Sequence, residues 1–398
     1  MSASEYIRVG TNLFRIVDQP MPDGKTKIKR IPWELSTFRA DHSKDEVADI
    51  PKYNGFCIVP SHENYQREIN SFYNIYEPID HEAAEGEWSH IKNLIGHIFG
   101  DQYEMGLDYL QLLYQEPLQD LPILMLVSVE RATGKSTFLN FLKALFKENA
   151  TFCTNESFHS QFNSDWADKL LVMIDETSLN RREDSERLKN LSTAKSIKSE
   201  AKGENRIEIE FFGKFVLCSN NEFCPLFIDD NEIRYWVRKV PVLQIDDTNF
   251  LQKCIDEIPA FLWYLKQRAL TTRKESRMWF GSELLQTEAL RKIVRANRSF
   301  VEIEMAEILR DIMDEMQVSI VEFTVGDLIP ILNYHNVRAE NHQIRKVLNE
   351  FWKLRPAANT LCYTCYKLNF PANPKYSGSR SKGRFYTVTY DLIKSILI

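Results

Sequence analysis

The chain has 398 residues, and its 50 Lys and Arg against 56 Asp and Glu give a formal net charge of −6. This balance argues against a protein that coats nucleic acid through bulk positive charge, but it does not exclude a local basic groove or pore. With 14 Gly and 15 Pro the chain is neither fibrous nor low in complexity. Its 7 Cys lack the dense spacing of a disulfide framework, so we expect a protein of a reducing cytoplasm.

No segment of the sequence predicts a membrane span or a secretory signal. The longest apolar stretch, residues 121–129, is about half of the roughly 20 residues that a spanning helix needs. The N-terminus has no basic segment followed by an apolar one, as a signal peptide would have. We therefore expect no membrane partner, and at roughly 150 residues per domain the length predicts two or three domains.

The first part of the chain predicts strands and then helices. Residues 1–87 form a β-rich N-terminal module in this interpretation, because residues 6–17 read as strand, turn and strand, and residues 56–60 as a further short strand. In residues 88–118 the apolar positions take a helical spacing. We expect this second segment to form a helical collar.

Residues 119–270 alternate apolar strands with amphipathic helices, which is typical of an α/β domain with a parallel sheet. The charged segment 271–300 follows, and we expect a lid or linker there. The strands are expected at 121–129, 169–175, 207–212, 214–220 and 237–243, and the helices at 136–146, 185–195 and 256–270.

The last part, residues 301–398, predicts a winged-helix-like domain that binds DNA or a protein partner. Two helices at 324–336 and 340–353 precede a β-like segment, a basic loop at 375–384 and a final strand. A hairpin with a basic tip after two helices is the organisation of a winged helix. The DNA-binding candidates in this loop are Lys382 and Arg384, supported by Lys375 and Arg380, with Arg345 and Lys346 on the second helix.

The most informative stretch joins an apolar strand to an amphipathic helix through a short loop with Gly-Lys-Ser-Thr at 134–137. In a phosphate-binding loop the backbone N–H groups hold phosphates, Lys135 reaches the β- and γ-phosphates, and Ser136 binds Mg²⁺. Val129 stands where the full motif has its first glycine. The alternative to a phosphate-binding loop is that Gly-Lys-Ser-Thr occurs here by chance. We expect ATP and Mg²⁺ as cofactors, bound by Ala132, Thr133, Gly134, Lys135, Ser136 and Thr137.

A second acidic motif supports the first. The apolar strand at 169–175 ends in Asp175 and Glu176, 40 residues after Lys135. In a Walker B strand the aspartate holds Mg²⁺ through water and the glutamate polarises the attacking water. A buried strand that ends in an acid only to cap its backbone is the alternative, but the distance from Lys135 favours the Walker B interpretation.

Two further candidates follow the strand at 214–220. Asn220, at its end, can sense the γ-phosphate and orient water; the alternative is a turn formed by Ser-Asn-Asn. Arg234 and Arg238 come next, at a distance suited to an arginine finger that acts on a neighbouring subunit. For one of these two arginines an ordinary ion pair on a strand is the better interpretation.

Taken together, these motifs resemble the superfamily 3 helicases, compact AAA+ motors of small DNA viruses, phages and plasmids. They look closest to the helicase part of phage/plasmid-type and poxvirus-type primase–helicases. The resemblance covers roughly residues 88–270, and it implies a hexameric ring with Arg234 as the finger. The segments that carry it are 134–137, 173–176, 188–212, 217–221 and 233–241.

The same resemblance implies a β-hairpin that lies in the pore of the ring and grips the DNA backbone with a lysine at its tip. Here Lys202 would be that lysine, with Arg206 as a further DNA-binding residue. Residues 187–206 contain six basic and two acidic side chains, 6 − 2 = +4, in a chain of net −6. Positive charge is expected where a polyanion passes. A solvated helix face is the alternative.

Other cysteine and acidic residues carry less weight. Cys362 and Cys365 form a single CxxC, and a predicted helix separates them from His335 and His342, so we do not expect zinc. In residues 1–87 no pair of aspartates on adjacent strand positions resembles a primase metal site. The expected function is thus an ATP-dependent DNA helicase of a phage, plasmid or mobile element, acting in the bacterial or infected-host cytoplasm. It would take single-stranded DNA in the pore, duplex or fork DNA at its C-terminal domain, and a separate primase or polymerase as a further partner.

Two alternatives from other classes remain. One is a nucleotide-switched assembly or defence ATPase that recognises DNA without unwinding it. The other is a DNA-binding module with a degenerate nucleotide site.

Overall fold

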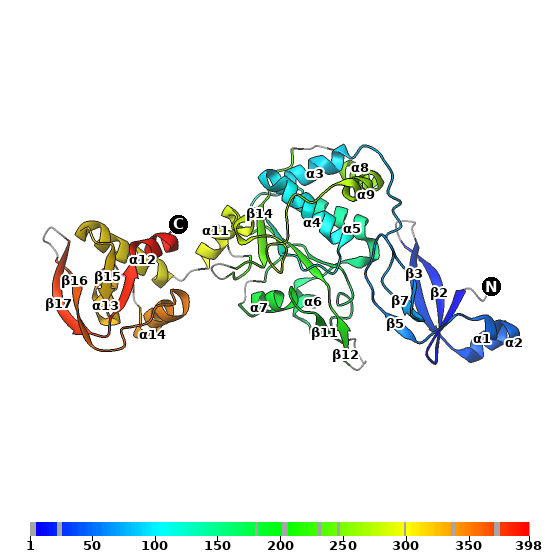
Figure 1. Cartoon of the computed structure of the whole chain (residues 1–398), viewed down its shortest axis with the longest axis horizontal. Helices are drawn as coiled ribbons and strands as arrows, with labels where there is room; N and C mark the ends of the chain where they lie inside the picture. The colour runs from blue at the N-terminus through cyan, green and yellow to red at the C-terminus, as the bar shows by residue number, and fades with distance from the viewer. Residues whose placement is uncertain are drawn as a thin grey trace. The chain divides into compact units, whose positions relative to one another are not determined.

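The computed structural model describes residues 5–21, 26–179, 182–200, 206–223, 225–228, 232–244, 247–297, 300–335, 337, 339–369 and 375–397. The contacts divide the chain into two compact units, and we describe each by itself (Figure 1). The first unit comprises residues 1–227 and 231–290, and the second comprises residues 228–230 and 291–398. The division falls within α11 (Glu288–Ala296).

The first unit begins with two small sheets. β1 and β2 are antiparallel and joined through Gly10, whose φ of 58° is the left-handed conformation that a tight turn needs and glycine readily adopts. The strand, turn and strand predicted at residues 6–17 are therefore confirmed. The four-stranded sheet has the order β3-β2-β1-β4, with β1 (Tyr6–Val9), β2 (Asn12–Pro20), β3 (Thr26–Trp33) and β4 (Lys52–Tyr53); the other has the order β5-β7-β6, with β5 (Gly55–Cys57), β6 (Glu68–Ile69) and β7 (Phe72–Asn74).

Successive residues of β1 pack on opposite faces of its sheet, as the pleat of a strand requires. Tyr6 lies in a cluster with Phe38 of α1 (Leu35–Asp41), whereas Ile7 lies in another with Tyr73 of β7. α2 (Lys44–Asp49) follows, and Ser43 begins it with a capping box. Each face of the sheet is thus covered by apolar side chains.

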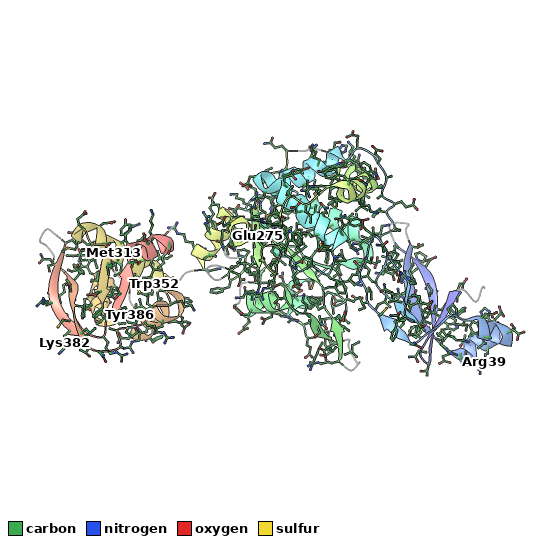
Figure 2. All side chains as sticks on the ribbon, in the orientation of Figure 1. Arg39, Glu275, Met313, Trp352, Lys382 and Tyr386 are labelled. Carbon is green, nitrogen blue, oxygen red and sulfur yellow. The ribbon has the colours of Figure 1, made fainter. Side chains whose placement is uncertain are left out.

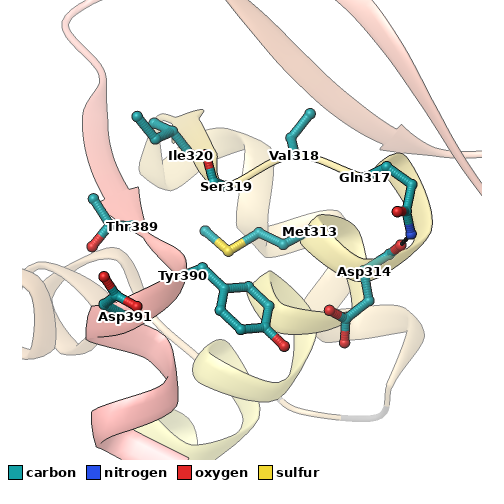
Figure 3. Close-up of a pocket in the computed structure, with 9 residues that line it drawn as sticks. All are labelled: Met313, Asp314, Gln317, Val318, Ser319, Ile320, Thr389, Tyr390 and Asp391. Carbon is teal, nitrogen blue, oxygen red and sulfur yellow. Dashed lines mark hydrogen bonds between the residues drawn. The ribbon is translucent and has the colours of Figure 1, made fainter.

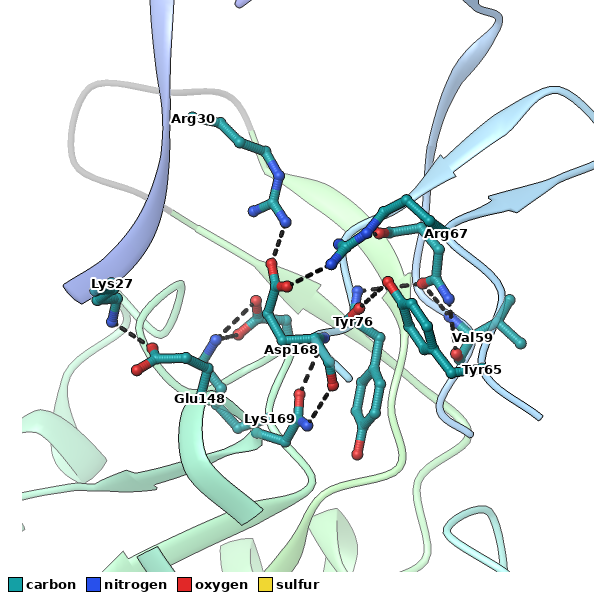
Figure 4. Close-up of polar contacts among 12 residues, drawn as sticks. Lys27, Arg30, Val59, Tyr65, Arg67, Tyr76, Glu148, Asp168 and Lys169 are labelled. Atoms are coloured by element: carbon teal, nitrogen blue, oxygen red, sulfur yellow. Dashed lines mark hydrogen bonds and ion pairs between the residues drawn. The ribbon is translucent and has the colours of Figure 1, made fainter. Parts of the chain in front are cut away.

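Ion pairs and hydrogen bonds join these small sheets to the rest of the first unit (Figure 4). Arg30 and Arg67 both pair with the carboxylate of Glu77. Asn149 donates its Nδ2–H to the Glu77 carbonyl at 2.7 Å, and Lys27 pairs with Glu148 at 2.5 Å. The module therefore contacts the α/β part through half-buried and exposed charged groups.

The helical spacing predicted from residue 88 onward is confirmed. α3 (Ser89–Phe99) and α4 (Tyr103–Gln115) are joined by the short η2 (Gly100–Gln102). Gly106 of α4 faces Phe99, and a Cβ atom there would come within 2.3 Å of the ring, so the two helices approach each other through a glycine. Their apolar faces belong to the main core of the unit.

A five-stranded parallel sheet lies at the centre of the first unit, with the order β14-β8-β13-β10-β9. Parallel sheets are covered on both faces, and so their strands are continuous apolar runs, as β8 is here. The predicted α/β class with a parallel sheet is confirmed. The strands are β8 (Ile123–Val127), β9 (Ala150–Phe152), β10 (Leu171–Ile174), β13 (Lys214–Ser219) and β14 (Tyr235–Lys239).

Helices connect and cover these strands. α5 begins directly after Gly134. The helix predicted at 256–270 corresponds to α9, and α8, which ends just before it, was not predicted. β9, an edge strand of three residues, was not predicted. The helices are α5 (Lys135–Phe146), η3 (Lys147–Asn149), α6 (Asn155–His159), α7 (Arg182–Leu191), α8 (Phe250–Asp256) and α9 (Ile258–Gln267).

A β-hairpin leaves this core. β11 (Ser196–Ser199) and β12 (Ile207–Glu210) pair antiparallel, so a hairpin at this point of the sequence is confirmed. Lys202, predicted at its tip, lies outside the described residues. The side chains of the hairpin are mostly exposed.

The beginning of the segment predicted as a lid or linker packs against the first unit. Thr271 and Thr272 donate backbone and hydroxyl hydrogen bonds to the buried carboxylate of Asp108. Phe280 and Leu285, the latter in α10 (Ser282–Leu285), belong to the main core. Residues 271–285 therefore contribute to the fold of this unit instead of forming a free connection.

The second unit has its own core, which includes Met313, Trp352 and Tyr386 (Figure 2). β15 pairs antiparallel with β18, and β16 with β17. Its helices are α12 (Phe300–Met316), α13 (Val325–Tyr334), α14 (Asn341–Lys346), the π-helical η4 (Val347–Phe351) and α15 (Tyr390–Leu397), and its strands are β15 (Ile320–Phe323), β16 (Leu361–Leu368), β17 (Tyr376–Gly383) and β18 (Tyr386–Thr389).

One prediction in this unit was wrong. Residues 375–384, expected as a basic loop, contain the strand β17, which pairs along its whole length with β16. Gly378 lies beside the ring of Tyr366 and Gly383 beside the ring of Tyr363, both on β16, and a Cβ atom at Gly383 would also come within 3.3 Å of Thr324. At one end of this pairing the Asn369 N–H donates to the Lys375 carbonyl at 2.8 Å, and residues 370–374 lie outside the described part of the chain.

No helix within the described residues combines the length and the apolar composition that a membrane span requires.

Candidate nucleotide site

A pocket of about 460 Å³ lies at the carboxyl ends of three adjacent parallel strands, β8, β13 and β10. This edge of a parallel sheet is where α/β proteins bind their ligands. The pocket gathers the predicted loop, the two predicted acids and the predicted asparagine. Its lining residues are Glu130, Arg131, Ala132, Thr133, Gly134, Lys135, Ser136, Thr137, Asp175, Glu176 and Asn220.

The loop adopts two left-handed backbone positions, Ala132 with φ 55° and Gly134 with φ 79°. A Cβ atom on Gly134 would lie 3.3 Å from Leu243 and 3.7 Å from His97, so glycine suits this position for space as well as for conformation. Val129, which replaces the first glycine of the full motif, is not among the residues with positive φ. The departure from the motif therefore does not force a strained backbone at that residue.

Backbone contacts hold the far end of the loop. The Leu243 N–H donates to the Ala132 carbonyl at 3.0 Å, and His97 Nε2 lies 2.9 Å from the Thr133 carbonyl oxygen. His97 is in the last turn of α3, so this helix contacts the loop directly. We had not predicted either contact, because nothing in the local sequence marks His97 or Leu243 as neighbours of the loop.

Lys135 begins α5 and is buried, with 6% of its surface exposed. Its Nζ donates to the Thr133 hydroxyl at 3.1 Å. Burial lowers the pKa of Lys135, while Asp175 and other acidic groups around it oppose that shift. A lysine held in this way presents its charge to the pocket at low solvent exposure, where it acts more strongly on a phosphate than in water.

Ser136 and Asp175 lie together although 39 residues separate them, since the Ser136 hydroxyl donates to Asp175 Oδ2 at 2.8 Å. These oxygen donors suit Mg²⁺, which proteins hold through one or two such groups and the phosphates of the substrate. Among the described residues no group of three His, Cys, Asp or Glu could hold a metal by itself. The pair therefore fits a Mg²⁺ that arrives with a nucleotide.

Glu176 is exposed to the pocket and has a left-handed backbone, with φ 55°. Asn155, the first residue of α6, bridges the turn that contains it: Nδ2 donates to the Glu176 carbonyl at 3.2 Å, and Oδ1 accepts from the Ser178 N–H at 3.1 Å. A non-glycine residue in this conformation is strained and needs such support. Sequence reasoning missed Asn155, which has no motif of its own.

Asn220 follows β13, and its side chain is exposed at the edge of the pocket. β13 lies directly beside β10, with Leu217 opposite Ile174, so the strand expected next to the Walker B strand is there. The Thr177 N–H donates to the Cys218 carbonyl at 2.6 Å and fixes the two strand ends against each other. Asn220 and Glu176 therefore line one pocket.

The two candidate finger residues differ in their surroundings. Arg238 is 12% exposed and donates to Gln102, to the Phe99 carbonyl and to Asp101. Arg234 is 26% exposed and pairs with Glu232 at 2.9 Å. Neither lines the pocket of its own chain as far as the described residues show.

The remaining predicted DNA-binding residues are exposed. Arg206 pairs with Glu200 just beyond the Ser199–Ile207 pair of the hairpin, with 55% of its side chain exposed. In the second unit Lys382 is exposed on β17 (Figure 2), and Arg384 donates its Nε–H to the Ala357 carbonyl at 2.9 Å. Lys382 therefore lies on a strand and not on a loop as we expected, whereas Arg384 lies in the connection between β17 and β18.

The second unit has a pocket of its own, of about 540 Å³, at the end of α12, the start of β15 and the junction of β18 with α15 (Figure 3). Asp314 and Asp391 line it, and no Lys or Arg does among the described residues. A site for phosphate groups would need positive charge or backbone donors. None of the predicted site residues lies there.

Comparisons with known proteins bear on the whole chain. A family model described as "Family of unknown function (DUF5906)" matches residues 126–238, which include the loop, both acids and Asn220. The DNA Primase-polymerase of Nitratiruptor phage NrS-1 is 24% identical over 277 residues, which are 66% of this chain and 37% of that protein. The chain is related to a phage primase-polymerase. It spans little more than a third of the length of that relative.

Solved structures of the C-terminal region of NrS-1 share the fold. One apo structure has a TM-score of 0.59 at 20% identity, covering 84% of this chain and 82% of that chain. The A form apo structure has the same TM-score at 19% identity, with 86% and 82% covered. The expected resemblance to a phage primase–helicase-type protein is thus confirmed, and the shared fold extends well beyond the residues that the family model matches.

Proposed function

We propose that the chain is an ATP-dependent DNA helicase of the superfamily 3 type, which works as a hexameric ring in the replication of a phage, plasmid or mobile element. One observation carries the proposal: the loop with Lys135, the acids Asp175 and Glu176, and Asn220 line a single pocket at the carboxyl edge of a parallel sheet. The relationship to a phage primase-polymerase supports the replication context.

In this proposal the pocket binds the phosphates of ATP. The backbone of the loop and the charge of Lys135 hold them, and Ser136 and Asp175 hold Mg²⁺. The metal, when bound, neutralises charge on the phosphates. The hydrogen bond between Ser136 and Asp175 supports this assignment, because it shows that the two oxygen donors lie within reach of one ion.

Hydrolysis would use the groups opposite the loop. Glu176 accepts a proton from the attacking water, and Asn220 orients that water. Arg234 comes from the neighbouring subunit and stabilises the charge that develops in phosphoryl transfer. Arg238 is less suited to this role, because Phe99, Asp101 and Gln102 already occupy its guanidinium group.

DNA would follow two surfaces. Single-stranded DNA passes the hairpin of β11 and β12, where Lys202 and Arg206 contact phosphates without reading bases. Duplex or fork DNA contacts the second unit, a winged-helix-like domain in which Lys382 and Arg384 are exposed. The order of α12, β15, α13, α14 and the hairpin of β16 and β17 supports this assignment.

The segments would then have separate roles. Residues 1–87 form a docking module, 88–118 a collar, 119–270 the AAA+ ATPase on which residues 271–285 pack, and 301–398 the DNA- or partner-binding domain. A separate primase or polymerase would supply the synthesis that unwinding serves.

ATP hydrolysis with and without single-stranded DNA tests the proposal. We expect hydrolysis to rise when single-stranded DNA is added, and Lys202→Ala to retain the basal rate and ring assembly but to lose the stimulation. Lys202→Arg should keep part of it, since the charge remains. A wild-type chain that hydrolyses no ATP in the presence of Mg²⁺ would refute the proposed function.

A further inference from the structure

We propose that Glu222 is a positioning residue that fixes the start of the phosphate loop, and that Lys239 holds Glu222 in place. This inference rests on the proposed nucleotide-binding function, since it names how the same pocket is kept in shape. Glu222 belongs to none of the motifs that predicted the site.

The contacts are direct. Glu222 Oε1 accepts the backbone N–H of Val129 at 3.2 Å. Lys239 Nζ lies 3.0 Å from the same oxygen and 3.1 Å from Oε2. The Glu222 side chain is 7% exposed and that of Lys239 is 47% exposed. The carboxylate is therefore buried between a backbone donor and a cation.

The three residues come from three neighbouring strands. Val129 follows β8, Glu222 follows β13, and Lys239 is the last residue of β14, where it pairs with Val127. Because β8 lies between the other two, Glu222 and Lys239 meet across the carboxyl end of the strand that leads into the loop. The contact thus holds the loop at the point where it leaves the sheet.

This end of the loop is the one at which the sequence departs from the full motif. Leu243 and His97 hold the far end through the carbonyls of Ala132 and Thr133. At the near end Val129 occupies the place of the first glycine, and its N–H is bound by Glu222. The loop is thereby held at its start and again at Ala132 and Thr133, which line the pocket.

The energetics explain why a cation accompanies the glutamate. A buried carboxylate loses its hydration, and one backbone hydrogen bond does not replace it. Lys239 supplies the compensating charge, and being half-exposed it remains hydrated itself. If Glu222 only capped the end of β13, its carboxylate would not need to accept the N–H of Val129, which follows the neighbouring strand β8.

The test compares Glu222→Ala, Glu222→Gln and Lys239→Met with wild type. Calorimetry gives the Kd of Mg·ADP and of Mg·ATP, steady-state kinetics gives kcat, and hydrogen exchange without nucleotide reports on the peptide that contains Val129. Glu77→Gln is the control, since Glu77 is also ion-paired and largely buried but lies outside the pocket.

We expect Glu222→Ala to raise both Kd values about tenfold, the loss of one hydrogen bond to a charged group. Exchange of the Val129 peptide should become faster. The kcat at saturation should change by less than about threefold, because the groups that would carry out the reaction are untouched. Glu222→Gln should recover much of the affinity, since its amide oxygen can still accept the Val129 N–H, and Lys239→Met should resemble Glu222→Gln. The control should match wild type.

Wild-type nucleotide affinity and unchanged Val129 exchange in both Glu222 variants would overturn the inference. So would a loss confined to kcat, which would place Glu222 in the chemical step. If wild type itself binds no nucleotide, the proposed function fails instead, and the exchange measurement still decides whether Glu222 fixes the loop.

Discussion

Glu176 and Lys135 line the same pocket, but substitutions at the two residues should affect nucleotide binding and hydrolysis differently. Glu176→Gln keeps the size and hydrogen bonding of the side chain and removes the base, so we expect nucleotide affinity within about threefold of wild type and kcat reduced about a hundredfold or more. Lys135→Ala should lose both nucleotide affinity and hydrolysis. Nucleotide binding and single-turnover hydrolysis measure the two effects separately. Hydrolysis by Glu176→Gln at a near wild-type rate would show that another group is the base.

Asn155 supports Glu176 through the backbone. Asn155→Ala removes both bonds across the turn, so the strained conformation of Glu176 should relax. We expect kcat to fall about tenfold or more with little change in the Kd of ATP, because the phosphate loop is not involved. Asn140→Ala is a matched control, since Asn140 is exposed on α5 and donates to the Ser136 carbonyl of the same helix. Equal kcat values for the two variants would show that Asn155 does not support Glu176 in hydrolysis.

Lys214 is a buried residue from which a pH dependence follows. It is 4% exposed, its Nζ donates to the Pro117 and Phe212 carbonyls, and burial lowers its pKa from 10.5 to about 7. Between these two pKa values the unfolded chain binds more protons than the folded chain, so stability rises with pH.

From about pH 7 to about pH 9 this contribution amounts to about 2 kcal/mol in favour of the folded state. Lys214→Met has no titratable group there. Urea unfolding of both proteins at the two pH values should therefore show the stability of wild type relative to Lys214→Met rising with pH. A constant difference would mean that Lys214 keeps an ordinary pKa in the folded protein.

At the scale of secondary structure, Asp108 connects α4 to the segment that follows α9. It accepts hydrogen bonds from Thr271 and Thr272 and pairs with Arg268, whose side chain is 7% exposed. Asp108→Ala removes the acceptor of both threonines and one of the two carboxylates that pair with the buried arginine, which keeps Glu104, and we expect a loss of roughly 3 kcal/mol in the free energy of unfolding.

Asp256 provides the comparison, because it is exposed at the end of α8 and bonds to Gln252 on the same helix. Asp256→Ala should cost about 1 kcal/mol or less. Urea unfolding measures both variants. Equal losses would show that the segment 271–285 is held by its apolar side chains alone.

The elements that the sequence predicted are those with strong local patterns. The strands β8, β10 and β13 are apolar runs that end in polar residues, and α5 follows a glycine. The positions of these elements in the sequence, and the sheet edge at which the three strands end, could therefore be inferred. β9 has only three residues, and β17 is rich in Ser, Gly and basic residues. Their pairing depends on neighbours distant in sequence, which a local pattern does not contain.

The same limit applies to the site. Residues that bind through a motif could be named in advance, and the pocket gathers them. His97, Asn155 and Glu222 reach the loop or the turn from other elements, at sequence distances of 21 to 93 residues. Only the packing of helices and strands around the pocket brings them there, so no spacing in the sequence could identify them.

At the scale of the whole molecule, the chain combines a net charge of −6 with basic side chains on a hairpin and on a separate C-terminal unit. Local positive charge of this kind would let DNA bind specific surfaces without coating the protein. The nucleotide pocket and these surfaces belong to different parts of the chain. The proposed helicase function therefore requires that ATP hydrolysis in the pocket move DNA along these surfaces.

Strand displacement from a forked DNA duplex tests this claim most directly, with Lys135→Ala as the matched control. We expect wild type to release the strand only when ATP and Mg²⁺ are both present, and Lys135→Ala, which keeps the fold but lacks the phosphate ligand, to release none. A wild-type chain that hydrolyses ATP in response to DNA yet releases no strand would contradict the account, and would identify a nucleotide-switched assembly instead of a helicase.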